Sequence, residues 1–593
     1  MTKGRLLALR QQLRDLGLQG FVVPHADEHQ NEYTPANAER LAWLTGFTGS
    51  AGQAALTMSE GAIFVDGRYT LQVRQQTDKR QFAPLDLFED KIEDWLAERV
   101  KKGDRIGYDP WLHTREWIGK VSDKLSEKGA ELLPVDENPI DQVWQGRPAD
   151  SDAPAVSHPT EYSGEESRHK RERIAADTKT KGADAVVLTM LDSIAWLFNI
   201  RGSDVAHTPL VSSYAILFAD GSATLFIDPG KVDEDLKGFL GKQVKLADKS
   251  DFIDHLKKLK QKKVCVDPKR THAAVFEILE KAGAKLIPAD DPCVLPKAMK
   301  NEAEITGTRN AHNRDAIAVC KFLAWLDEMG PKGEIDEIDA EEKLLSFRQE
   351  QPLFKDTSFG TISGAGPNGA IVHYRATEQS RRKLEPDMLY LVDSGGQYLD
   401  GTTDITRTVI IGTPTEEQKD RFTRVLKGHI ALAQARFPHG RSGAHLDSLA
   451  RKPLWDVGLD YNHGTGHGVG SYLGVHEGPQ SISRLGFNVP LEPGMILSNE
   501  PGYYKEGEYG IRIENLVLVR ERKFEEEEQP MLSFETLTHV PIDKRLVNAY
   551  MMTTPEITWF NIYHAQVREI VGPHLSGKEK DWLMKATESL VVL

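Results

Sequence analysis

The sequence predicts a multidomain protein of the mixed α/β class, and three observations lead to that prediction. Its 593 residues exceed the size at which a single hydrophobic core keeps growing, so several domains are expected. The first third contains a weak internal repeat of short apolar strands and helical stretches. From about residue 355 glycine becomes dense, and strand-like runs alternate with turn residues around one long helical pattern at about 415–435.

The repeat consists of two copies with the same order of apolar segments. The segments are 20–23, 42–44 and 62–66 in the first copy, and 185–188, 195–197 and 224–228 in the second. Their approximate separations match, although the offset drifts by several residues. Two copies of one α/β unit explain this better than chance similarity between buried strands.

Two changes in composition mark candidate domain boundaries. Residues 147–165 are rich in Pro, Ser, Asp and Glu without apolar periodicity, which is typical of an interdomain linker. A second boundary falls near 297–304, before a long pattern of apolar residues at helical spacing. We therefore expect domains at 1–150, 151–300 and 301–593.

Composition and charge restrict the function classes. Lys and Arg total 74 and Asp and Glu total 89, and the formal charge of −15 argues against a nucleic-acid or anionic-membrane partner. Three scattered cysteines are too few for a disulfide framework or a thiolate metal site, and they fit a reducing, cytoplasmic setting. The sequence shows neither a signal peptide nor an apolar run long enough to span a membrane, so no membrane association is expected.

The segment 389–408 contains two strand-like runs around a Gly-rich turn, which predicts an antiparallel hairpin. By the period of two, Leu391 and Asp393 share one face of the first strand. Asp404 and Thr406 share one face of the second, so the hairpin can bring both carboxylates to one side. Such carboxylates repel, and one stays protonated unless a cation lies between them. The alternative is that either aspartate only caps a turn.

Two glutamates extend this acidic set. Residues 511–519 read as a strand whose interior carries Glu514, on the same face as Arg512. A buried glutamate needs a partner, which either Arg512 or a metal supplies. Upstream, an apolar strand ends at Glu500, directly before a Pro-Gly turn.

Histidines add nitrogen donors. His463 and His467 lie at positions i and i+4, but the glycines around them make a helix unlikely, which excludes the helical HExxH zinc motif. A Gly-rich phosphate cradle is the weaker alternative, because no Lys-Ser/Thr follows the glycines. Spacing alone leaves open which of the two is a ligand. His373 and His476 are further candidates; a lone buried histidine is usually structural, but these accompany four strand-borne acids.

Carboxylates with one imidazole provide mostly hard oxygen ligands. This donor set suits Mn²⁺, with Zn²⁺, Co²⁺ and Fe²⁺ as alternatives. Two ions about 3.5–4 Å apart would hold a bridging hydroxide at neutral pH. Hydrolysis of an amide or ester is the reaction that such a centre serves best.

The series of acids and histidine in these contexts resembles the "pita-bread" metallopeptidases, which include methionine aminopeptidase, prolidase and aminopeptidase P. The fuller resemblance is to the long, three-domain cytosolic form of Xaa-Pro aminopeptidase, over essentially the whole chain. The segments that carry it are Ser50–Gly52, Asp66–Tyr69, Leu191–Asp204, Leu426–Ile430, His463–Gly470 and Glu500–Tyr504. A helical tail similar to that of the long form follows from about Thr554.

The resemblance implies two creatinase-like α/β domains, then a pita-bread metallopeptidase domain, in a homodimer. It also implies that one set of side chains binds two divalent metal ions. The ligands would be Asp393, Asp404, His467, Glu500 and Glu514. Of these, Asp404 and Glu514 would bridge both ions, Asp393 would complete one ion, and His467 with Glu500 the other.

Further roles follow from the same resemblance. Glu500 would also help to deprotonate the bridging water. His373 and His476 would stabilise the tetrahedral intermediate and steady the scissile amide. His463 would contact the substrate near its proline, and Arg512 would act on the bridging carboxylates.

The activity expected from the resemblance is removal of the N-terminal residue from peptides with proline second. The first alternative is a prolidase restricted to Xaa-Pro dipeptides, which the chain length disfavours. The second is a non-catalytic binding module that has kept the fold but lost its metal ligands. All five ligand positions are filled here, which disfavours that reading.

Overall fold

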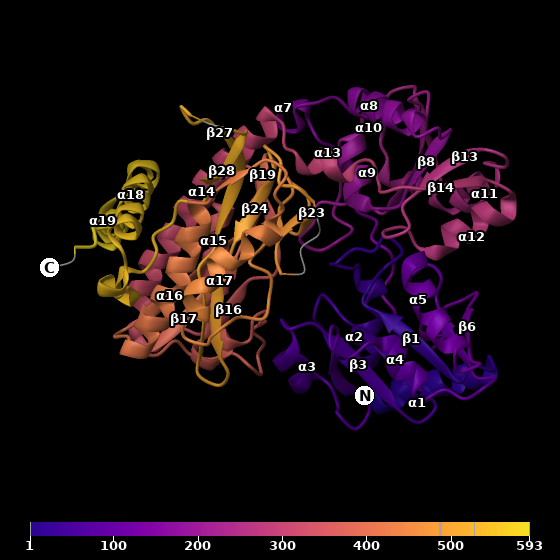
Figure 1. Cartoon of the computed structure of the whole chain (residues 1–593), viewed down its shortest axis with the longest axis horizontal. Coiled ribbons are helices and arrows are strands. Elements are labelled where there is room, and N and C mark those ends of the chain that lie inside the picture. The colour runs from indigo at the N-terminus through magenta and orange to yellow at the C-terminus, as the bar shows by residue number, and fades with distance from the viewer. Residues whose placement is uncertain (1, 485–488, 527, 592–593) are drawn as a thin grey trace. The chain divides into compact units, whose positions relative to one another are not determined.

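The structure is a computed structural model that describes residues 2–484, 489–526 and 528–591. The chain divides into two compact units (Figure 1). The first comprises Met1–Thr160 and Glu165–Val294, and the second comprises Glu161–Gly164 and Leu295–Leu593. Among the residues that the structure describes, no helix combines the length and apolar character that a membrane crossing requires.

The first unit contains two six-stranded sheets of the same topology. Their strand orders are β4-β3-β2-β1-β5-β6 and β12-β11-β10-β8-β13-β14. In the first sheet β2 pairs antiparallel with both β3 and β1, and all other pairings are parallel. In the second sheet β10 pairs antiparallel with both β11 and β8, and all other pairings are again parallel. The predicted repeat of one α/β unit is therefore confirmed.

The strands of the first sheet are β1 (Gly20–Pro24), β2 (Gln53–Thr57), β3 (Gly61–Val65), β4 (Ala83–Asp86), β5 (Arg105–Tyr108) and β6 (Glu131–Pro134). Those of the second are β8 (Ala185–Leu188), β10 (Ser213–Phe218), β11 (Ala223–Ile227), β12 (Val244–Ala247), β13 (Lys263–Val266) and β14 (Lys285–Pro288). The middle segment of each sequence repeat is helical, in α2 (Arg40–Thr45) and α9 (Leu191–Phe198).

Strand β1 shows why these runs are apolar throughout. Phe21 packs in one core with Leu9 of helix α1 (Thr2–Asp15), whereas Val22 packs in another core with Leu125 of helix α5 (Arg115–Ser126). Successive side chains of a strand point to opposite faces. A strand covered by a helix on each face therefore reads as a continuous hydrophobic run.

The second unit begins with the long helix α14 (Glu302–Met329). Its start is fixed by a capping box, in which the Asn301 side chain accepts from the backbone N–H of Glu304 and the Glu304 side chain accepts from the N–H of Asn301. The helix buries Val319 and Leu323 in the main core of this unit. Helix α15 (Glu337–Gln349) follows and packs against it.

Two sheets of the second unit carry the predicted site. A three-stranded sheet contains β16 (Ile362–Ala365), β17 (Met388–Ser394) and β20 (Ile405–Ile411). A six-stranded sheet has the order β21-β28-β27-β24-β22-β23. Its strands are β21 (Arg436–Pro438), β22 (Gly466–Gly468), β23 (Glu477–Ile482), β24 (Ile496–Asn499), β27 (Asn515–Arg522) and β28 (Met531–Thr536). A separate hairpin joins β25 (Gly502–Lys505) to β26 (Tyr509–Arg512).

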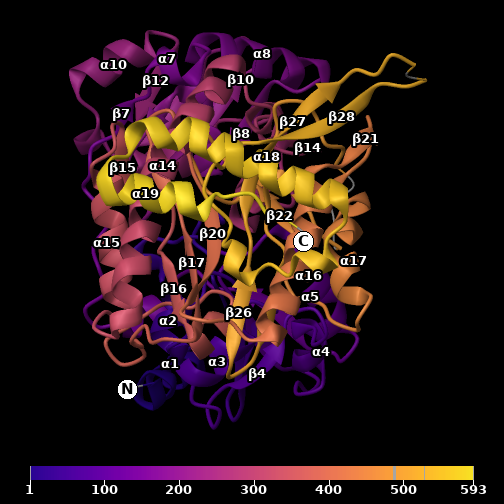
Figure 2. The same ribbon diagram turned by 90° about the vertical axis from the view of Figure 1, so that its left-hand side faces the viewer.

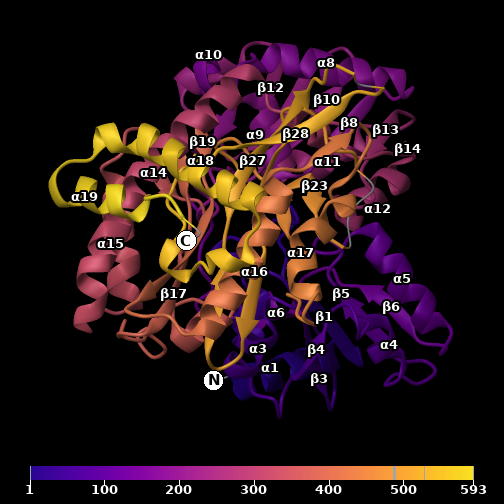
Figure 3. The same ribbon diagram turned by 60° about the vertical axis from the view of Figure 1, so that its left-hand side comes forward.

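Helices complete the second unit. The predicted helix at about 415–435 is α16 (Glu416–Ala433), which packs against α17 (Asp447–Trp455) (Figure 3). The C-terminal helices α18 (Thr554–Val571) and α19 (Gly577–Ala586) run side by side (Figure 2). Both helices contact α14.

Buried Arg407 on β20 ties the C-terminal helix to the sheets. Its guanidinium donates to the Tyr563 hydroxyl on α18 at 2.8 Å and to the Glu514 carbonyl at 2.7 Å. It also donates to the carbonyls of Val540 and Pro541. One side chain thus links α18 to the segment that carries a predicted ligand.

Candidate metal centre

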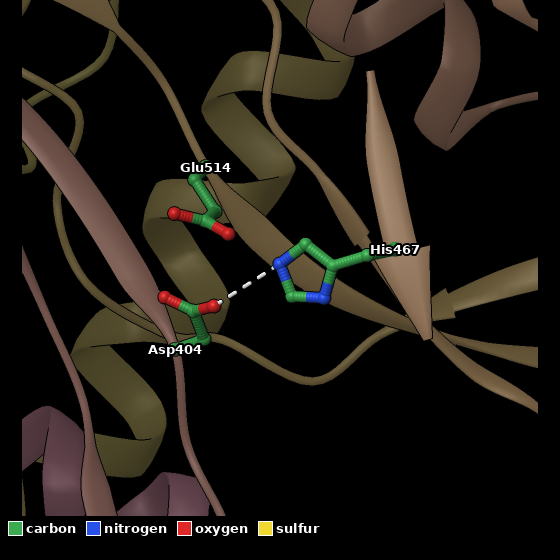
Figure 4. A group of neighbouring side chains, drawn as sticks. All are labelled: Asp404, His467 and Glu514. Carbon is green, nitrogen blue, oxygen red and sulfur yellow. Dashed lines mark ion pairs between the residues drawn. The ribbon is translucent and has the colours of Figure 1, made fainter. Parts of the chain in front are cut away.

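Three of the predicted ligands meet at one point. Asp404, His467 and Glu514 each offer one ligand atom, and these atoms lie within 4.8 Å of one another. Figure 4 shows the two carboxylates beside each other, with the imidazole ring directed at them. Asp404 directly precedes β20, His467 lies on β22, and Glu514 lies between β26 and β27. The group is therefore assembled from separate sheets.

The two remaining predicted acids, Asp393 and Glu500, interact electrostatically with this cluster. Asp393 lies near the end of β17, opposite Thr406 of β20, so the predicted antiparallel hairpin is confirmed. Glu500 follows β24 at the Pro-Gly turn, and its Oε1 lies 3.5 Å from His467 Nε2. The charges of both acids bear on the ionisation of Asp404 and Glu514.

One local prediction is wrong. Glu514 does not lie inside a continuous strand, because the chain leaves β26 at Arg512 and enters the six-stranded sheet at Asn515. The Glu514 backbone N–H instead donates to the Thr406 carbonyl at 3.2 Å. This contact with a distant strand interrupts the local ladder, and it brings the glutamate close to the aspartate hairpin.

The electrostatics of the cluster favour a bound cation. Burial, followed by the charges of Asp393 and Glu500, raises the pKa of Asp404 well above its ordinary value. Burial, followed by the charge of Asp404, raises the pKa of Glu514 in the same way. Buried carboxylates that repel one another in this manner are stabilised when a cation lies between them.

Unpaired oxygens support the same conclusion. Within the described residues, Asp393 Oδ1, Asp404 Oδ1 and Glu514 Oε1 are buried and accept no hydrogen bond. Buried polar atoms in proteins nearly always have a partner. Several oxygen donors with one imidazole nitrogen therefore fit divalent metal ions.

The position of His467 separates it from His463. His467 Nδ1 lies 2.9 Å from the Gly468 carbonyl, so a proton on Nδ1 donates there and leaves Nε2 facing Asp404 Oδ2 at 3.4 Å. His463 Nε2 instead lies 2.8 Å from the Tyr504 hydroxyl. Of the two histidines that spacing left open, only His467 lies in the carboxylate cluster.

Arg512 connects the acids in a buried network. Its Nη2 donates to Asp393 Oδ2 at 2.6 Å, and its Nε donates to the Thr406 hydroxyl at 3.1 Å. The Thr406 hydroxyl in turn donates to Glu514 Oε2 at 2.7 Å. Arg512 Nη1 also donates to the Tyr504 hydroxyl at 2.7 Å. The arginine thus holds two acids and, through Tyr504, His463.

Sequence reasoning missed the parts played by Thr406 and Tyr504. In the sequence, the only indication of a role for Thr406 is that it shares a strand face with Asp404. That pattern does not reveal its contacts with Glu514 and Arg512. Tyr504 closes the Glu500–Tyr504 motif, but the motif does not reveal that its hydroxyl lies between His463 and Arg512.

The two other predicted histidines border the cluster. The His476 ring packs edge-on against the His467 ring, with centroids 4.2 Å apart. His373 lies in the turn that follows the short helix η5 (Gly366–Ala370). The Val372 carbonyl beside it accepts from Arg512 Nη2 at 3.4 Å, so this turn is tied to the same network.

Four segments of the chain match described protein families. Residues 306–521 match metallopeptidase family M24, and residues 530–590 match the C-terminal region of peptidase M24. Residues 5–143 and 146–304 each match the creatinase/prolidase N-terminal domain. The paired N-terminal matches agree with the two sheets of equal strand order.

Relatives match over their full length. Aminopeptidase P1 of Arabidopsis thaliana is 38% identical, and the match covers 97% of this chain and 97% of that protein. A probable Xaa-Pro aminopeptidase P of Coprinopsis cinerea is 39% identical, with 99% and 98% covered. The crystal structure of X-prolyl aminopeptidase from Caenorhabditis elegans, described as a cytosolic enzyme with a di-nuclear active site, is 34% identical. It matches with a TM-score of 0.95 and covers 100% of both chains.

Proposed function

This chain belongs to metallopeptidase family M24, in its aminopeptidase P branch, and on that premise we propose that it removes the N-terminal residue from peptides whose second residue is proline. The observation that carries the proposal is the cluster of Asp404, His467 and Glu514 in a chain that matches these enzymes end to end. Bonds to proline resist general peptidases because the prolyl nitrogen carries no N–H and its ring is sterically fixed.

The proposed ligands of two divalent ions are the five residues around this cluster. They are Asp393, Asp404, His467, Glu500 and Glu514. Asp404 and Glu514 would contribute to holding both ions, and their unpaired buried oxygens support that assignment. When bound, such a pair polarises the scissile carbonyl and lowers the pKa of a water molecule. Mn²⁺ is the proposed ion, since oxygen donors predominate.

Side chains of this chain perform the remaining steps. Glu500, whose Oε1 also accepts from the Ser498 hydroxyl at 3.0 Å, takes the proton from the attacking water. His373 and His476 donate to the developing oxyanion and orient the scissile amide. His463 contacts the substrate near its proline, and Arg512 keeps Asp393 and Glu514 oriented through its direct and Thr406-mediated contacts.

The organisation of the chain forms part of the proposal. We assign the domains to residues 1–150, 151–300 and 301–593, a homodimer as the assembly, and the cytoplasm as the location.

Large exposed apolar side chains on and after α17, among them Trp455 at 48% and Val457 at 44% exposure, support an interface between copies. Trp455→Arg is expected to convert the dimer to a monomer in light scattering, and a monomeric native protein would contradict the assignment.

Cleavage of short proline peptides tests the proposed activity. The protein is expected to release arginine from Arg-Pro-Pro, to lose this activity after chelation, and to regain it best with Mn²⁺. Asp404→Ala should be inactive, whereas Asp356→Asn, a change at an exposed aspartate, should not affect turnover. Cleavage of Arg-Pro but not Arg-Pro-Pro would favour a prolidase. Full turnover after exhaustive chelation would refute the metal mechanism.

A further inference from the structure

A buried glutamate outside the candidate metal cluster holds the loop that carries His373. Glu337 is the first residue of α15, and its side chain is fully buried. Its carboxylate accepts hydrogen bonds from the Ala365 N–H at 2.7 Å and from the Arg382 N–H at 2.9 Å. It also accepts from Asn368 Nδ2 at 2.9 Å and from the Tyr374 hydroxyl at 2.9 Å.

These four donors all belong to one connection in the three-stranded sheet. Ala365 ends β16, and Arg382 lies in the later part of the segment that leads to β17 at Met388, so the carboxylate binds two separate parts of this connection. Asn368 and Tyr374 lie within that segment. Residues 377–383 are exposed, so little apolar packing holds this stretch in place. Hydrogen bonds to an ionised acceptor are stronger than neutral ones, so the carboxylate is a strong anchor for this loop.

His373 lies between two anchored neighbours. On one side, the Val372 carbonyl accepts from Arg512, which also binds Asp393. On the other side, the Tyr374 hydroxyl donates to Glu337. The backbone of His373 is thus held between the metal-binding network and α15.

We propose that Glu337 is a positioning residue for His373, acting through Tyr374 and the loop backbone. This inference rests on the proposed role of His373 at the scissile amide. A displacement of about 1 Å in a reacting group lowers the rate on the order of a hundredfold. Burial raises the pKa of Glu337, which is consistent with a carboxylate enclosed by the loop it holds.

Glu337→Gln tests the proposal with little change in volume. The substitution turns one acceptor oxygen into an amide that faces the N–H donors of the loop. With Arg-Pro-Pro we expect kcat to fall about tenfold to hundredfold, whereas KM changes by less than about twofold, as for a residue that acts in the transition state. Tyr374→Phe should show a smaller fall in kcat. Glu342→Gln, the same change at an exposed position of α15, is the matched control and should leave kcat unaltered.

A double-mutant cycle with His373→Ala separates positioning from general damage. If Glu337 acts through His373, Glu337→Gln lowers kcat by less than about twofold in the His373→Ala background. An equal loss in both backgrounds would overturn the proposal. If His373→Ala retains the native kcat, the proposed role of His373 fails, which is a separate result.

The histidine resonances provide a readout that does not depend on turnover. In protein labelled at histidine Cε1, Glu337→Gln should shift or broaden the His373 signal, assigned by its loss in His373→Ala. The signal of His564, buried on α18, should stay unchanged. An unaltered His373 signal would overturn the proposal even if kcat fell.

Discussion

Thr406→Val is the most informative single change, because one hydroxyl links an acid of the cluster to the arginine that supports it. The hydroxyl donates to Glu514 Oε2 at 2.7 Å and accepts from Arg512 Nε at 3.1 Å. Valine keeps the shape of the side chain and removes both contacts. A hydrogen bond to a charged group contributes about 1.5–3 kcal/mol net.

Of the two contacts, the bond to Glu514 is the one made directly to a proposed metal ligand. Its loss should therefore weaken metal binding by about 1.5–3 kcal/mol, on the order of tenfold to a hundredfold. Loss of an outer partner of a metal ligand typically has an effect of about this size. The same hydroxyl lowers the pKa of Glu514, so its removal lets protons compete better with the metal. The loss of affinity should be larger at lower pH.

Thr408→Val is the matched control on the same strand. Thr408 is as buried as Thr406, but its hydroxyl contacts only the backbone of Arg512, with both partners at 3.0 Å. Mn²⁺ titration of the metal-free variants against a chromophoric chelator measures the two affinities. Equal losses in both variants, or native affinity in Thr406→Val, would refute the proposed role of the threonine.

Three further changes test other features of the site. Burial and neighbouring acids raise the pKa of Asp404 in the folded metal-free protein. The unfolded chain therefore releases this proton more readily, and the folded state loses stability as the pH rises above the unfolded-state pKa of about 3.9. Metal-free Asp404→Asn should therefore have a higher Tm than the metal-free native protein by a margin that grows with pH, and equal Tm values across the range would contradict this. Arg407→Met leaves the carbonyls at its site without a donor, and should lower the free energy of unfolding by about 3 kcal/mol or more in urea titrations, whereas a change below about 1 kcal/mol would contradict its role. A methyl group added by Gly510→Ala would overlap the Gly369 carbonyl and displace the His373 loop, so kcat should fall, unlike in Gly238→Ala, where the added group meets open space.

The sequence predicted features that depend on local periodicity. The strands of the N-terminal repeat are apolar on both faces because helices cover both sides of the sheet. Such continuous apolar runs can be recognised in the sequence alone. The aspartate hairpin follows from the period of two, and the structure pairs Asp393 with Thr406 in that hairpin.

Features that depend on distant contacts were not predictable in the same way. The break at Glu514 arises from its backbone bond to Thr406, which no local pattern signals. Spacing could not separate His463 from His467, because the difference lies in which partner each ring meets. Glu337 gives no sequence signal for its contacts, since the start of a helix commonly carries an acid for reasons of the helix dipole alone.

The cluster of Asp404, His467 and Glu514 has a consequence for biosynthesis. Its members come from different sheets and lie far apart along the chain. Until Glu514 has been synthesised, the nascent chain lacks one of the three residues of this cluster. The incomplete set of ligands holds an ion more weakly than the full set. Metal loading must therefore come after synthesis of most of the second unit.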